Sequence, residues 1–441
     1  MRKIIFIYII AFNLIFSLPI SENFAIEISE NFYYSKNDRR ISSFSVEYTE
    51  TYINNNDNVF YIIHLNPEGF ILISADNFIL PVLGYSFENN YSSNDIPTNI
   101  EYLFNLYSKQ MIEQREESNQ DNYIGSQWEK FSNLVEYESQ NRSVSPLISA
   151  RFDQGTPWND MCPEDSEGPG GNVLVGCVAV SMAQIMHYWS YPATGYGSHG
   201  YTHGQYGYQY VDFSNATYDY DDMPSNYGTP ETAKLLYHAG VAVHMDYSPW
   251  GSGASVCWDG PSAQNALDVN FQYNDNITCE VKINYSDEEW ELKMKDQLDR
   301  GWPMVYRGYS EDAGHAWNID GYQNILRNNY FHCNWGWGGS ANGYFYFDNL
   351  NGGGYNFIEN QAALLNIIPD NINPPVALFE FSIEDLGNNS NDNSLDNNDV
   401  QDYIEYKAGN LDEHQYMLYV QLKESIGESH CRNIGELNQA F

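Results

Sequence analysis

The chain has 441 residues, and its 59 Asp and Glu against 20 Lys and Arg give a formal net charge of −39 at neutral pH. Hydrophobic residues make up 42% of the chain and aromatic residues 16%, which is ample for buried cores and excludes wholesale disorder. Nucleic acid and anionic membranes are excluded as partners, because both require a basic protein surface.

The N-terminus has the pattern of a secretory signal peptide. Arg2 and Lys3 precede an almost unbroken apolar run over 4–16, which is short for a bilayer span of about 20 residues. We therefore expect residues 1–24 to be a signal peptide, the protein to be secreted, and the mature form to have no membrane partner. The alternatives are a buried N-terminal strand and an uncleaved anchor.

Residues 25–140 are predicted to form a small domain of strands followed by helices. The apolar runs 59–65 and 70–75 flank turn residues and predict a hairpin, and 79–85 adds another apolar run. Apolar residues at helical spacing within 97–138 predict one or two amphipathic helices.

A shift in composition towards Gly, Trp and Tyr marks a second domain over 149–369, which follows the polar linker 141–148. Apolar periodicity predicts helices over 177–189, 230–242, 262–269 and 287–300. Short apolar runs predict antiparallel strands near 316–322, 330–333, 344–347 and 362–368. Helices followed by strands are typical of an α+β fold.

The C-terminal part of the chain carries no recognisable chemistry. Residues 388–399 are nearly all Asn, Asp and Ser, so we expect 370–400 to be a disordered linker. Residues 401–441 form a tail to which the sequence assigns no role.

The six cysteines are sparse for a disulfide framework in a chain of this length. One or two disulfides are compatible with the sequence, which does not fix the pairing. Neither a Cys-x-x-Cys pair nor a His-Glu-x-x-His motif occurs, so we expect no metal and no cofactor.

Cys177 differs from the other cysteines because it opens a predicted helix directly after Gly176. Unpaired N–H groups and the positive end of the helix dipole stabilise a thiolate at such a position. The alternative is an ordinary buried cysteine.

A thiolate nucleophile needs a base, and His315 is the best placed of the ten histidines because its small neighbours leave room around the ring. Asn334 and Trp335 follow in the chain; an Asn carbonyl can orient an imidazole, and a Trp can shield that bond from water. The alternatives are a structural histidine and a glycine-rich turn with packed tryptophans. The order Cys, His, Asn-Trp is that of papain-like cysteine proteases.

Several separated motifs together resemble the streptopain family of bacterial papain-fold peptidases, although the papain signature Cys-Gly-Ser-Cys-Trp is absent. In the second domain these motifs are 154–159, 176–179, 183–186, 191–192, 314–316, 319–322 and 334–339. Upstream, 69–76 and 81–86 resemble the propeptide domain of that family.

The resemblance implies a two-lobed papain-like catalytic domain of class α+β, with a helical lobe and a β-sheet lobe, behind an inhibitory α+β propeptide domain. It implies that the zymogen is cleaved in or near the 141–148 linker. By the same likeness, Cys177 is the nucleophile, His315 the base, Asn334 the residue that orients it, and Gln154 a donor of the oxyanion hole. The residues implied to bind substrate are Gly314, Ser252, Trp335 and Trp337.

We therefore expect a secreted cysteine endopeptidase that acts on proteins or peptides and has its own propeptide as intramolecular inhibitor. Two other functions fit the same residues. One is a catalytically silent papain-fold adhesin or glycan-binding protein, since abundant Tyr and Trp suit carbohydrate stacking. The other is a different acyl-transfer enzyme on the same fold, such as a transglutaminase or amidase.

Overall fold

The computed structural model describes residues 19–37, 42–93, 98–117, 122–132, 143–258, 260–309, 314–326, 328–347 and 361–370. The expected linker and tail after residue 370 and most of the expected signal peptide lie outside these residues. Within the described ranges, no helix is both long and apolar enough to cross a bilayer.

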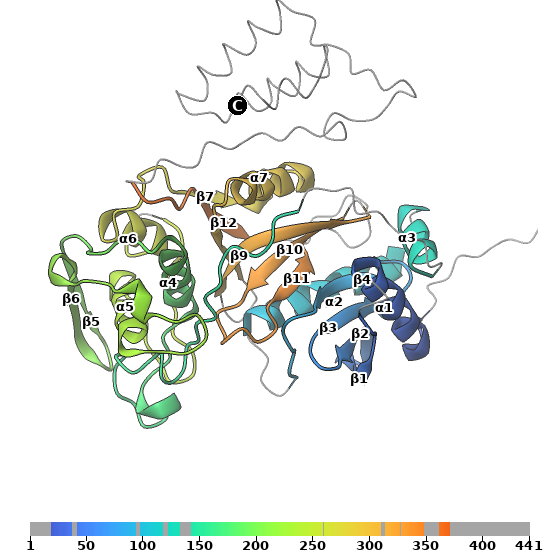
Figure 1. The fold of residues 1–441 in the computed structure, drawn as a ribbon, viewed down its shortest axis with the longest axis horizontal. Coiled ribbons are helices and arrows are strands. Elements are labelled where there is room, and N and C mark those ends of the chain that lie inside the picture. The colour runs from blue at the N-terminus through green and yellow to red at the C-terminus, as the bar shows by residue number, and fades with distance from the viewer. Residues whose placement is uncertain are drawn as a thin grey trace, which may run out of the picture. The chain divides into compact units, whose positions relative to one another are not determined.

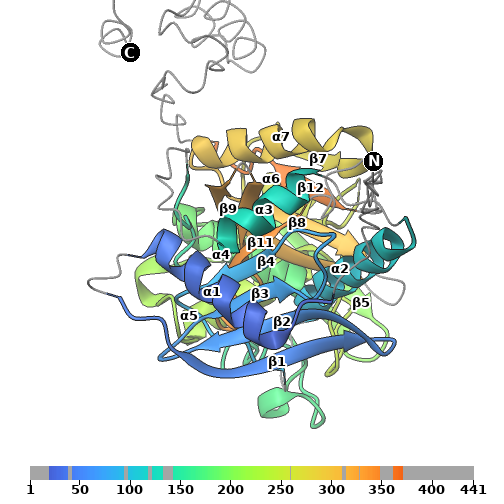
Figure 2. The same ribbon diagram turned by 90° about the vertical axis from the view of Figure 1, so that its right-hand side faces the viewer.

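The described residues of the N-terminal domain form four strands and three helices. They are α1 (Glu22–Lys36), β1 (Val46–Asn54), β2 (Asp57–Leu65), β3 (Phe70–Ser74), β4 (Val82–Ser86), α2 (Thr98–Glu117) and α3 (Asn122–Ser132). The antiparallel β2–β3 hairpin and the two later helices confirm the sequence prediction. Helices α1 and α2 cover opposite faces of these strands (Figure 2). Phe32 of α1 packs on Tyr85 of β4, and Phe104 of α2 packs on Phe60 of β2. Because side chains alternate between the two faces of a sheet, Tyr85 and Phe60 point in opposite directions.

Helix α1 is absent from the sequence prediction and begins ahead of residue 25, the expected start of this domain. Ser21 caps it by accepting a hydrogen bond from the Phe24 N–H. The Ile20 N–H donates to the Ala75 carbonyl at 2.9 Å. In this structure residues 19–24 therefore belong to the folded N-terminal domain.

The second domain begins with a helical lobe (green in Figure 1), followed by the strands of the second lobe. Its helices are α4 (Cys177–Trp189), α5 (Pro230–Ala242), α6 (Ala263–Val269) and α7 (Asp287–Asp299), with short 3₁₀ turns at Pro169–Gly171, Phe213–Asn215, Tyr220–Asp222 and Lys282–Asn284. Its strands are β5 (Ser198–His203), β6 (Gly207–Asp212), β7 (Thr278–Val281), β8 (Met304–Tyr309), β9 (Gly314–Ile325), β10 (Asn328–Asn334), β11 (Gly343–Tyr346) and β12 (Ala362–Leu365). The predicted helices and strands are confirmed, and with them the α+β class.

One sheet runs through both domains. Its strand order is β1-β2-β3-β4-β11-β10-β9-β8-β12-β7, so strands of the N-terminal domain extend the sheet of the second (Figure 1). The junction is the β4–β11 pair, where Gly84 lies opposite Phe345. A Cβ atom at Gly84 would lie 2.6 Å from the Phe345 ring, so only glycine fits there without a shift. Tyr107 ties the junction from α2, because its hydroxyl lies 2.9 Å from the Leu83 carbonyl and 2.8 Å from that of Tyr346.

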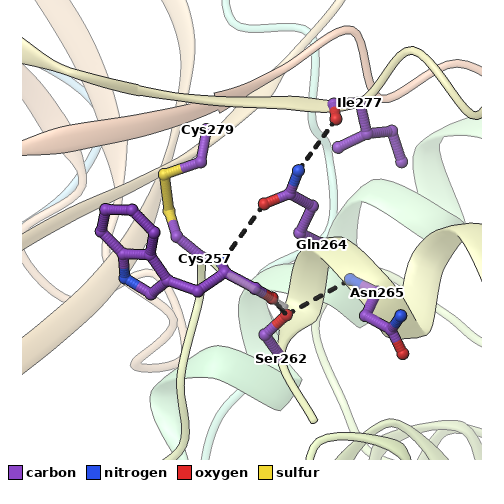
Figure 3. Close-up of a disulfide and its surroundings, with 7 residues drawn as sticks. Cys257, Ser262, Gln264, Asn265, Ile277 and Cys279 are labelled. Atoms are coloured by element: carbon purple, nitrogen blue, oxygen red, sulfur yellow. Dashed lines mark hydrogen bonds between the residues drawn. A yellow bond between two sulfur atoms is a disulfide. The ribbon is translucent and has the colours of Figure 1, made fainter. Parts of the chain in front are cut away.

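A single disulfide is found among the described residues, between Cys257 and Cys279 (Figure 3). It joins the segment that enters α6 to strand β7. Gln264 reinforces the same link, since its amide nitrogen donates to the Ile277 carbonyl at 3.0 Å, and Ser262 caps α6. The helical lobe is thereby attached covalently to the edge strand of the large sheet.

Candidate active site

Cys177 is the first residue of α4, as its sequence position predicts. The preceding Gly176 has φ +96°, and a Cβ there would lie 2.6 Å from the Met245 sulfur and 3.1 Å from the Ser252 carbonyl. Glycine is therefore required for the chain to turn sharply into the helix. The turn leaves Cys177 at the helix N-terminus, where backbone N–H groups have no partner within the helix.

The thiol of Cys177 lies against the beginning of strand β9. The backbone N–H groups of Ala316, Val178 and Cys177 itself are within hydrogen-bonding reach of the sulfur and favour the thiolate. Burial acts in the opposite direction and dominates, so the pKa of Cys177 is raised. Burial therefore favours the protonated thiol in this structure.

His315 directly precedes Ala316 on β9, so the proposed base lies one residue along the strand from the backbone N–H that faces the Cys177 sulfur. The pair comes from opposite lobes: Cys177 from helix α4, His315 from the sheet. Burial lowers the pKa of His315, which favours the neutral imidazole. Among the described residues, no hydrogen bond joins the imidazole to Cys177 or to Asn334.

Asn334 ends strand β10 and is almost fully buried. Its Nδ2 donates to the Ala150 carbonyl at 2.8 Å, and its Oδ1 accepts from Gln184 at 3.0 Å and from the Gly336 N–H at 3.3 Å. Asn318 of β9 joins this network by donating to Gln184 Oε1 at 2.9 Å. In this structure Asn334 therefore ties α4 to the sheet.

The backbone of Gln154 is hydrogen-bonded to the segment that precedes the nucleophile. Its carbonyl accepts from the Val175 N–H at 3.0 Å, two positions before Cys177. The side chain is buried, and its amide makes no hydrogen bond to any other described residue. An oxyanion hole needs an amide donor beside the helix N-terminus, and this role of Gln154 stays a prediction.

The four residues implied to bind substrate lie in different settings, and their role stays a prediction. Gly314 is exposed at the start of β9. Ser252 is buried, and its hydroxyl donates to the Leu174 carbonyl at 2.6 Å, which fixes the loop beside Gly176. Trp335 is fully buried and donates to the Ala341 carbonyl at 3.0 Å, whereas Trp337 is partly buried.

Tyr102 of the N-terminal domain reaches the site, which the sequence did not indicate. Its ring lies against Gly308, where a Cβ would come within 2.4 Å of a ring carbon. Gly308 is paired with His315 across β8 and β9. An aromatic residue in an amphipathic helix looks like any core residue, so no sequence signal marks this contact.

A second group missed by the sequence analysis is Asp320 of β9 with His332 of β10. Asp320 is fully buried, and its Oδ1 lies 2.6 Å from His332 Nδ1. No cluster of three or more potential metal ligands occurs in the described ranges.

Comparison with known proteins finds a family match for each of the two domains. Residues 152–345 match the Peptidase C10 family, and residues 17–111 match the Spi protease inhibitor. The chain is 27% identical over 340 residues to streptopain of Streptococcus pyogenes, covering 70% of this chain and 80% of streptopain. It is 26% identical over 364 residues to the thiol protease/hemagglutinin PrtT of Porphyromonas gingivalis, covering 75% of this chain and 39% of PrtT.

A solved structure supports the same assignment. The prointerpain A fragment of Prevotella intermedia superposes with a TM-score of 0.58 at 27% identity, covering 73% of this chain and 99% of the fragment. The expected architecture, a papain-like domain behind a propeptide domain, is confirmed.

Proposed function

On the premise that the chain belongs to the peptidase C10 family and is a cysteine peptidase with a Spi-type propeptide, we propose that it is a secreted endopeptidase zymogen that works through Cys177 and His315. The observation that carries the proposal is the contact between the Cys177 thiol and Ala316. This contact brings a helix N-terminal thiol to the residue next to the only histidine on that strand.

In the active enzyme, the Cys177 proton passes to the His315 imidazole, and the thiolate attacks a peptide carbonyl carbon. A C–S bond forms, and the carbonyl oxygen becomes an oxyanion held by the Gln154 amide and the Cys177 N–H. The imidazolium of His315 then gives its proton to the leaving amine as the C–N bond breaks. Water, deprotonated by His315, releases the acyl group from the thioester and restores the thiol.

Asn334 orients His315 only if its Oδ1 exchanges one of its present partners, Gln184 or Gly336, for the imidazole. We assign this change to the removal of the propeptide, whose Tyr102 lies against Gly308, the residue paired with His315. Asn334 is thus a structural tie in the zymogen and an orienting residue in the mature enzyme.

The propeptide domain makes two contacts that we infer to be inhibitory. It adds strands to the catalytic sheet, and it brings Tyr102 against the strand beside His315. Burial then favours the neutral forms of Cys177 and His315 rather than the reactive ion pair. Cleavage near the 141–148 linker and dissociation of the propeptide reverse both effects. Secretion follows from the signal-peptide pattern at the N-terminus.

The test is incubation of the purified full chain with reductant, followed by mass spectrometry and casein hydrolysis. We expect an N-terminal piece of roughly 14 kDa to be released and casein to be digested. Cys177→Ala should lose both activities. Cys162→Ala is the matched control, since burial raises the pKa of that thiol to about 12 and keeps it protonated.

Casein hydrolysis by Cys177→Ala would contradict the proposed nucleophile. A chain that is alkylated at Cys177 but cleaves no protein substrate would instead favour another acyl-transfer reaction. A chain that neither cleaves protein nor reacts at Cys177 would favour the silent binding protein.

A further inference from the structure

Asp320 is a buried carboxylate that the proposed chemistry does not use. It is fully inaccessible in the middle of β9, and its Oδ1 accepts a hydrogen bond from His332 Nδ1 at 2.6 Å. Its Oδ2 accepts from the backbone N–H of Ile148 at 2.9 Å. Because burying a carboxylate is costly unless its hydrogen bonds are satisfied, this N–H donor is strongly held.

The Ile148 N–H belongs to a strand-like segment that runs along β9. Val144 and Tyr322 exchange two backbone hydrogen bonds of 2.9 Å, and the Leu147 N–H donates to the Asp320 carbonyl at 2.9 Å. Gly321 is required there, because a Cβ would lie 2.8 Å from the Val144 carbonyl oxygen. The end of the expected processing linker is therefore a fixed part of the catalytic domain.

The same segment continues to the active site. The Ala150 carbonyl accepts from Asn334 at 2.8 Å and from Gln184 at 3.2 Å. The Phe152 carbonyl accepts from the Gly338 N–H at 3.1 Å, and the Gln154 carbonyl accepts from the Val175 N–H at 3.0 Å. Each alternate residue from 148 to 154 is thus hydrogen-bonded to the protein body. We call residues 144–154 the entry strand.

We propose that Asp320, held by His332, is a positioning residue that fixes the entry strand so that Gln154 presents its amide to the oxyanion. This inference rests on the oxyanion role of Gln154 in the proposed function. Asp320 touches no reacting atom; it acts through the Ile148 N–H and the extended backbone that follows. An extended chain transmits displacement along its length, and a shift of about 1 Å at a reacting group lowers rates by up to roughly 100-fold.

The experiment compares two reactions of the mature enzyme, produced from full-length variants by processing with a trace of the parent enzyme. Peptide hydrolysis requires the oxyanion hole, whereas alkylation of Cys177 by iodoacetamide does not, because no carbonyl oxygen becomes negative. We expect Asp320→Ala to lower kcat by roughly 10- to 100-fold, with KM and the alkylation rate within about twofold of the parent. Asp320→Asn keeps an acceptor oxygen for the Ile148 N–H, so it should lower kcat less than Asp320→Ala does.

Gln154→Ala is measured in parallel, alone and combined with Asp320→Ala. We expect Gln154→Ala to lower kcat by about 100-fold or more. Because Asp320 acts through Gln154, the kcat of the double variant should be close to that of Gln154→Ala alone. Should Asp320→Ala fail to fold, Ile148→Pro removes the same hydrogen bond from its donor side, and the same two rates are measured. Asp299→Asn is the matched control, since that carboxylate binds the Tyr322 hydroxyl on the same strand.

The inference is overturned if Asp320→Ala leaves kcat within twofold of the parent, if hydrolysis and alkylation fall together, or if its effect adds fully to that of Gln154→Ala. A Gln154→Ala enzyme with unchanged kcat removes the oxyanion assignment of the proposed function, and this inference with it. If Gln154→Ala loses activity but Asp320→Ala does not, only the positioning role of Asp320 fails.

Discussion

Gly84→Ala should weaken the hold of the propeptide on the catalytic domain. The new Cβ would lie 2.6 Å from the Phe345 ring and 3.0 Å from the Tyr344 carbonyl oxygen, both in the β4–β11 junction. Phe345 is fully buried and cannot move aside freely. Overpacking of this kind costs about 1–3 kcal/mol. Opening of the junction should become more frequent by the corresponding factor, roughly 5- to 150-fold.

The measurement is the rate at which iodoacetamide modifies Cys177 in zymogens that also carry His315→Ala, which prevents self-processing. We expect Gly84→Ala to accelerate this modification by the factor above. Gly204→Ala is the control, because a Cβ there meets no atom within 4 Å. Equal rates for Gly84→Ala and Gly204→Ala in folded protein would refute the idea that the sheet junction holds the propeptide over the thiol.

Two further predictions concern the thiols. Burial raises the pKa of Cys177 above its ordinary value of 9.0 in the zymogen, so thiolate forms only as the pH rises through that raised value. Alkylation of the zymogen should therefore accelerate about tenfold per pH unit up to at least pH 9; a plateau below about pH 7 would show that the ion pair already exists before processing. Replacing both Cys257 and Cys279 by Ala should lower the free energy of unfolding by about 3 kcal/mol, given their sequence separation of 22, as measured by denaturant titration. An unchanged titration midpoint would show that the link adds nothing to stability.

Elements with strong local signals could be predicted from the sequence. The α7 helix has Ser286 and Glu289 in a capping box, and α5 has Thr229 as its cap with Pro230 at the first position. Helix α1 also has a cap, Ser21, but the cap directly follows an apolar run that reads as a signal peptide, so the sequence did not identify the helix. Strand β1 is mostly polar and only partly buried, so it lacks the apolar run that identifies β2.

In the candidate site too, only residues with a local sequence signal could be predicted. Cys177 and His315 could be singled out because their immediate neighbours carry the signal: a glycine turn before a helix, and small residues around a ring. Asp320 and His332 could not, because their partnership depends on the register of two strands and on a bulge between His332 and Cys333. The present partners of Asn334 likewise come from α4 and the entry strand, far away in the chain.

The shared sheet has a consequence for the enzyme after its propeptide has left. Strand β11 then becomes an edge strand, and its backbone groups that were paired with β4 become exposed to water. An exposed edge strand can pair with a strand of another molecule, which leads to aggregation. Proteins limit this hazard in part by keeping their edge strands short. Because β11 has only four residues, it offers few backbone hydrogen bonds to a strand of another molecule.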